Sequence, residues 1–94
     1  MTINKKFDLY KTFLRNKPCA VVRKDSPEMN FYRIEMEYKI ENQQLFVNAF
    51  LDKNEKPGIV GYGATINNYK GKRLAKFNNP FLAKTLYEHG QKYL

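Results

Sequence analysis

The chain has 94 residues, of which 43% are hydrophobic and 15% aromatic, so we expect one folded domain over residues 1–94 with a single modest core. The apolar runs are too short for a membrane span, and the first seven residues lack the apolar stretch of a secretory signal. Cys19 is the only cysteine, which favours a reducing, intracellular location in the cytoplasm, with the nucleus or mitochondrion as alternatives.

The net charge of +8 is unevenly distributed along the chain. Residues 1–24 and 56–94 each carry a net charge of +6, and residues 25–55 carry −4. No acidic residue lies between Glu55 and Glu88, although six lysines and arginines do. Segregated positive charge of this kind indicates a polyanionic partner such as nucleic acid.

The first predicted element is an amphipathic helix. Its apolar residues recur with spacings of four, three and four, at Ile3, Phe7, Tyr10 and Leu14. We expect the helix to end before Pro18, because proline disfavours the helical conformation in the residue before it.

Four strands are predicted next. The clearest is residues 32–40, where apolar residues from Tyr32 to Ile40 alternate with charged ones, as in a strand with one buried face. Residues 19–23 form a short β-branched run, residues 45–51 are apolar on both faces apart from Asn48, and residues 59–66 contain two spaced glycines.

The C-terminal part predicts a second helix. Asn79 is a suitable cap, Pro80 a suitable first helical residue and Gly90 a suitable stop. The basic stretch of residues 69–77 is compatible with a helical turn, a strand or a loop. The element order predicts an α+β fold of the α-β-β-β-α type, with a three- to four-stranded antiparallel sheet and both helices on one face.

This order, together with two short motifs, resembles the double-stranded RNA-binding domain. Ser26-Pro27-Glu28-Met29 before an aromatic strand is similar to the family's loop between its first two strands, with Met29 in place of the family's histidine. The run from Gly71 to Lys76 is similar to its basic motif at the start of the last helix. Pro80 falls inside that helix in the family, so the helix either kinks at Pro80 or begins there with the basic motif outside it.

The resemblance implies binding of double-stranded RNA through its shape and its phosphates, over about 16 base pairs. It implies three contact regions, in the basic stretch, the loop after the first strand and the first helix. The residues concerned are Lys70, Lys72, Arg73 and Lys76, then Pro27, Glu28 and Met29, and finally Lys5, Lys11 and Arg15.

Two other functions remain open. A protein-interaction or dimerisation module would be favoured by exposed apolar groups on residues 45–51. A single-strand binder would stack bases on Phe46 and Phe50, which share one strand face, although packing of both in the core is the expected arrangement.

The residues do not predict an enzyme, a metal site or a cofactor. His89 and Cys19 are the only histidine and the only cysteine, and they lie far apart in the sequence. Glu35 and Glu37 share a strand face, where solvated charges are more common than an acid/base pair.

Overall fold

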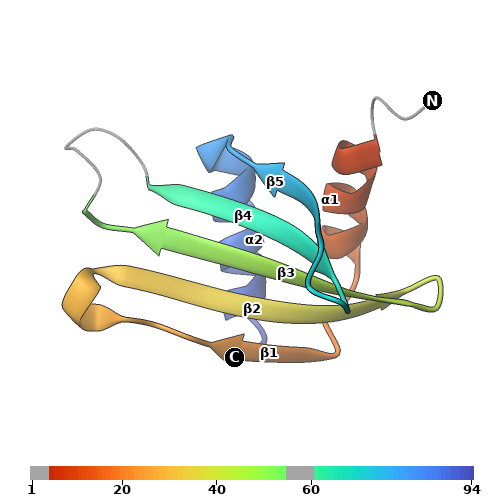
Figure 1. Cartoon of the computed structure of the whole chain (residues 1–94), viewed down its shortest axis with the longest axis horizontal. Coiled ribbons are helices and arrows are strands. Elements are labelled where there is room, and N and C mark those ends of the chain that lie inside the picture. Colours follow the sequence, from red (N-terminus) through yellow and green to blue (C-terminus); the bar gives the residue numbers. More distant parts are fainter. Residues whose placement is uncertain (1–4, 55–60) are drawn as a thin grey trace.

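Five antiparallel strands form one sheet, and both helices cover the same face of it, as Figure 1 shows with α2 running behind the strands. The computed structural model describes residues 5–54 and 61–94, with side chains from residue 8 onward. The elements in chain order are α1 (Lys5–Arg15), β1 (Ala20–Arg23), the short 3₁₀ helix η1 (Pro27–Met29), β2 (Phe31–Ile40), β3 (Gln43–Asp52), β4 (Tyr62–Asn68), β5 (Arg73–Phe77) and α2 (Pro80–Gln91).

The sheet is a meander in which each strand pairs with the next one in the chain, in the order β1-β2-β3-β4-β5. Its longest unit is the β2–β3 hairpin, whose two-residue turn, Glu41 and Asn42, has positive φ angles of 52° and 67°. Turns with two positive φ angles match the natural twist of paired strands. Most backbone hydrogen bonds of the sheet are therefore local in sequence.

The core lies between the sheet and the two helices. The predicted alternation of residues 32–40 is confirmed, because Ile34, Met36 and Tyr38 are buried towards the helices. Phe13 of α1 and Leu86 of α2 are fully buried against this face. The Tyr38 hydroxyl donates a hydrogen bond of 3.1 Å to the carbonyl oxygen of Phe13, which ties α1 to the sheet.

The predicted α+β class and the helix-strand order are confirmed, but the sheet has five strands and not three or four. The additional strand is β5, which comes from the basic stretch that the sequence left ambiguous. Helix α2 begins at Pro80, with the Asn79 side chain accepting hydrogen bonds from the backbone N–H groups of Phe81 and Leu82. The basic motif therefore lies outside the last helix.

Two details of the C-terminal helix and the third strand differ from expectation. Gly90 does not end α2; it is buried within the helix, where an added Cβ would lie 2.9 Å from both Ile34 and Met36 side-chain atoms. Phe46 and Phe50 are not in the core, because in β3 it is Leu45, Val47 and Ala49 that face the helices. Neither described helix is long and apolar enough to cross a membrane.

We expect Gly90→Ala to destabilise the protein, although Ala normally favours a helix interior over Gly by about 1 kcal/mol. The added methyl group would collide with Ile34 and Met36, and such overpacking costs about 1–3 kcal/mol. Urea unfolding would measure the difference. Gln91→Ala, at an exposed position of the same turn, is the control and should change stability little. A Gly90→Ala protein more stable than the wild type would contradict the close packing of α2 on β2.

Tyr38 should make stability fall at alkaline pH. Burial raises the pKa of its hydroxyl, so the folded state keeps the phenol neutral where the unfolded chain ionises it. The stabilising contribution is complete below about pH 10, the ordinary tyrosine pKa, and is lost as the pH rises above it.

Tyr38→Phe should therefore show a shallower decline above about pH 10, after an initial loss of about 1 kcal/mol for the missing hydrogen bond. Urea midpoints at neutral and alkaline pH would show this. Tyr69→Phe, which removes an exposed phenol, should retain the wild-type decline. If the stability of the wild type and of Tyr38→Phe fell equally at alkaline pH, the attribution of this fall to the Tyr38 hydroxyl would be refuted.

Candidate nucleic-acid interface

Four of the predicted RNA-binding residues lie together on the β4–β5 hairpin. Lys70 and Lys72 are in its turn, Arg73 and Lys76 are in β5, and all four are exposed. We call these four residues the basic hairpin. Lys70, Lys72 and Arg73 form no ion pair with any described residue, so their charges are not neutralised locally.

The turn of the basic hairpin is fixed by one asparagine side chain. The Asn68 carboxamide oxygen accepts hydrogen bonds of 2.9 Å from the backbone N–H groups of both Lys70 and Lys72. Gly71 has a φ of 85°, which glycine adopts at little cost. The pairing of β4 with β5 shifts register between Ile66 and Asn67, and such a bulge redirects the strands next to the turn.

The first helix lies against the same edge of the sheet. The rings of Tyr10 in α1 and Phe77 in β5 have centroids 5.9 Å apart. Lys11 follows Tyr10 and is exposed, as is Arg15 in the last turn of α1. The side chain of Lys5, the third cation predicted on this helix, lies outside the described residues.

The loop predicted to enter a minor groove lies at the other end of the sheet. Pro27, Glu28 and Met29 form η1, which is exposed and precedes β2. Phe31 pairs with Asp52, whereas the basic hairpin begins next to the pair Leu45 and Asn68. Seven residues of β3 separate these positions, or about 23 Å at the usual rise of a strand. The structure therefore does not bring η1 and the basic hairpin together.

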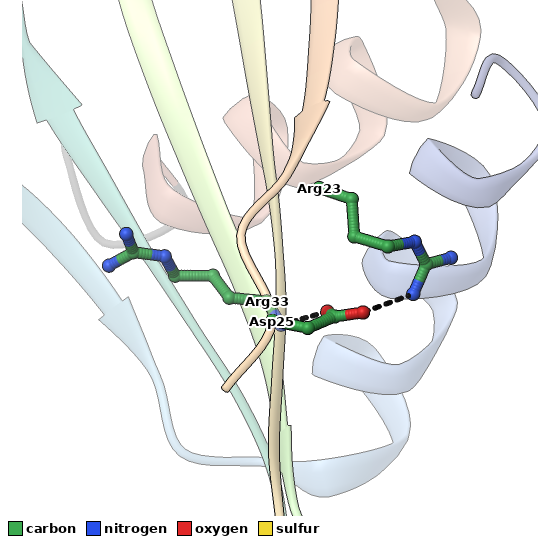
Figure 2. Close-up of polar contacts among 3 residues, drawn as sticks. All are labelled: Arg23, Asp25 and Arg33. Carbon is green, nitrogen blue, oxygen red and sulfur yellow. Dashed lines mark hydrogen bonds and ion pairs between the residues drawn. The ribbon is translucent and has the colours of Figure 1, made fainter. Parts of the chain in front are cut away.

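Asp25 binds the backbone near the start of β2 and forms an ion pair with a nearby arginine. Its carboxylate accepts 3.2 Å hydrogen bonds from the Arg23 guanidinium and from the backbone N–H of Arg33. Figure 2 shows the Arg23 side chain extending towards α2 and the Arg33 side chain extending to the opposite side of the sheet. The bond to Asp25 raises the pKa of Arg23. Arg23 is thus paired, while Arg33 belongs to the face without helices.

That uncovered face of the sheet, here the open face, carries a group of aromatic residues. Phe46 and Phe50 are half-buried on it, and Phe31 stacks on Phe50 with ring centroids 5.7 Å apart. Gly63 lies beneath Phe50, since an added Cβ would be 2.5 Å from the ring. Such rings offer flat surfaces to a partner as well as to each other.

The open face is hollowed where the β4–β5 turn reaches over it. A cavity of about 710 Å³, here the Tyr69 hollow, lies between this turn and the end of the β2–β3 hairpin. Its walls combine apolar groups with charges and amides, supplied among others by Glu37, Lys39, Gln44, Asn68, Tyr69 and Leu74. A smaller hollow of about 200 Å³ adjoins it and shares Asn68 and Tyr69 with it.

The smaller hollow, here the Asn48 hollow, contains a polar atom that lacks a partner. It is lined by Phe46, Asn48 and Asn67 on the open face. The Asn48 side-chain oxygen is buried and has no hydrogen-bond partner among the described residues, and the same is true of the Arg33 Nε atom. A buried polar atom without a partner costs about 1–3 kcal/mol.

His89 and Cys19, the residues considered for catalysis, lie in different elements and differ in exposure. His89 is buried in α2, with its Nε2 atom 3.1 Å from the carbonyl oxygen of Asn16. Cys19 is exposed before β1. Among residues 5–54 and 61–94 no group of histidine, cysteine and acidic side chains is arranged to hold a metal ion.

No protein-family model matches the sequence, and neither a curated protein nor a solved structure matches the chain. The fold alone therefore defines the class, an antiparallel five-stranded meander with two helices on one face. Sequence patterning did not single out Tyr69 or Asn48, which line the hollows, and it considered Glu37 only as a surface carboxylate. The alternation of residues 32–40 does place Glu37 on the exposed face, whereas Tyr69 lies in the turn of a β4–β5 pairing that the sequence pattern did not predict.

Proposed function

We propose that the protein is a nucleic-acid-binding module without a catalytic centre, and that double-stranded RNA is the ligand of its basic hairpin. The observation that carries this proposal is the arrangement of the acid-free segment. The described residues from Gly61 to Tyr87 include no acidic side chain, and within them the basic hairpin lies exposed at a sheet edge. A row of cations at an edge suits a phosphate backbone.

The chemistry of the hairpin fits phosphate binding. Arg73 can donate two parallel hydrogen bonds to one phosphate, and Lys70 and Lys72 act as flexible point charges on either side of Gly71. Because A-form RNA is recognised by shape and phosphates, no side chain has to enter its deep major groove. Lys11 and Arg15 of α1 supply further cations on the helix side of the sheet.

The acids of the open face do not cancel this charge. Glu37, Phe46, Asn67 and Arg73 follow one another across neighbouring strands, so three strand spacings separate Glu37 from Arg73. That is about 14 Å at the usual spacing of strands. The screening length at physiological ionic strength is about 8 Å. In addition, Glu35 already forms an ion pair with Lys24 at 3.2 Å.

A second candidate, binding of a single strand, is favoured by the positions of Phe46 and Phe50. Both lie on the open face, where unpaired bases could stack on them, and not in the core where sequence patterning placed them. The third function, a protein-interaction module, requires exposed apolar groups on residues 45–51. Leu45 is buried in the core and Leu51 packs partly against it, which leaves only the two phenylalanines for such a contact.

The test is the double variant Lys72→Ala/Arg73→Ala, measured by fluorescence anisotropy against a 16-base-pair RNA duplex over a range of salt concentrations. We expect weaker binding and a plot of log affinity against log salt that is shallower by about 1.8, the value for two lost phosphate contacts. Lys84→Ala/Lys92→Ala removes the same charge from exposed positions of α2 and the residue after it, and should retain most of the affinity and slope.

Duplex DNA and single strands of matched sequence complete the comparison. Tighter binding to duplex RNA than to either supports shape recognition. Equal affinity for all three would reduce the activity to general polyanion binding, and the absence of any binding at low salt would refute the proposal.

A further inference from the structure

We propose that the two hollows on the open face bind an unpaired stretch of nucleic acid, whose bases pass the ring of Tyr69 and are selected for an exocyclic amino group. This inference rests on the proposed nucleic-acid binding and assigns it a second surface, which adjoins the basic hairpin and shares Lys70 and Lys72 with it. The basic hairpin offers phosphate contacts, and the hollows beside it offer contacts to bases.

The shape of this surface suits bases better than a flat protein contact. The β4–β5 turn overhangs the open face, and the Tyr69 hollow beneath it has a volume of about 710 Å³, within the range of sites for small organic groups. The Asn48 hollow continues from it past Asn68 and Tyr69. A flexible strand can follow this path, because each unpaired base can turn independently of its neighbours.

Aromatic rings are available along the path. Tyr69 borders both hollows and is 65% exposed, so its ring is accessible to a ligand there. Phe46 lines the floor of the Asn48 hollow. Stacking of bases on such rings is tolerant of sequence and supplies much of the affinity in single-strand binders.

The Glu35 and Glu37 carboxylates are the acceptor-only side chains that line the hollows, among amides that both donate and accept. The Asn48 oxygen is buried without a partner among the described residues. The Glu37 carboxylate faces the Tyr69 hollow and accepts one hydrogen bond, from the Gln44 side chain at 2.5 Å, which leaves further acceptor capacity. Carboxylates read the amino group of cytosine, and uracil carries an acceptor at the same position. The hollows should therefore prefer cytosine to uracil.

Cations at the rim provide for the phosphates of the same strand. Lys70 lies next to Tyr69, with its ammonium nitrogen 5.6 Å from the ring centroid, and Lys72 follows Gly71 in the same turn. Lys39 lines the Tyr69 hollow from β2. A single strand with its bases in the hollows and its phosphates at the rim would match this arrangement, because the acceptors and rings lie inside and the cations lie around them.

The experiment compares binding of labelled single strands of twelve cytidines and twelve uridines at low salt, with the blunt RNA duplex as a third ligand. For the wild type we expect cytidine to bind about fivefold more tightly than uridine. Tyr69→Ala should weaken both single strands about tenfold and leave the duplex nearly unchanged. Glu37→Gln should narrow the difference between cytidine and uridine, because an amide offers a donor where the carboxylate accepts.

Phe81→Ala is the matched control. Phe81 is another exposed aromatic, at 76%, but it lies in α2 on the helix side of the sheet, so its removal should leave all three affinities unchanged. Thermal melting of each variant would verify that it folds.

The outcomes separate this inference from the proposed function. Duplex binding that depends on Lys72 and Arg73, together with single-strand binding unaffected by Tyr69→Ala, would overturn the inference and leave the proposed function standing. No binding to any nucleic acid would overturn both. Equal binding of cytidine and uridine strands would overturn the selection by Glu37. A dimer that dissociates in Tyr69→Ala would identify the open face as an interface between copies and also overturn the inference.

Discussion

Both helices pack on the same face of the sheet, and the exposure of the other face and of the β5 edge follows from this. In β2 and β3 the residues that face the helices are apolar and small enough at Ala49 to let the helices approach closely. Gly90 brings α2 into contact with Ile34 and Met36, where no larger residue fits without displacing them. Because both helices are packed on this face, the opposite face of the sheet stays uncovered by helices.

The surfaces that the helices leave uncovered carry the exposed charged and aromatic side chains considered for binding. Where an edge strand is left unpaired, charged side chains protect it from pairing with another chain, and Arg73 and Lys76 provide that protection in β5. Arg73 lies about 14 Å, three strand spacings, from Glu37 of the open face. Protection of the edge and attraction of phosphate are therefore compatible uses of one basic hairpin.

Local patterns in the sequence predicted the elements that local physics decides. The alternation of residues 32–40 gave a strand with one buried face, and the Asn79-Pro80 pair gave the start of α2, because capping and proline geometry involve only neighbouring residues. The strand β5 was not predictable in the same way, since its pairing depends on a bulge opposite Ile66 and Asn67. Phe46 and Phe50 were expected in the core because a strand that is apolar on both faces does not show which face the helices will cover.

The most informative feature of the open face is the combination of side chains that a purely protective surface would not need. Lysines and arginines alone would keep the edge soluble, and isolated exposed aromatics are common on protein surfaces. An exposed Tyr69 bordering two hollows, a buried Asn48 oxygen without a partner among the described residues, and Glu37 at the wall of the larger hollow are less easily explained by folding alone. Stability would favour a partner for the Asn48 oxygen, because an unsatisfied buried acceptor costs free energy in the folded state. A ligand that donates a hydrogen bond and presents a flat ring would contact Glu37 and Tyr69 at once, and an unpaired nucleobase with an amino group has both properties.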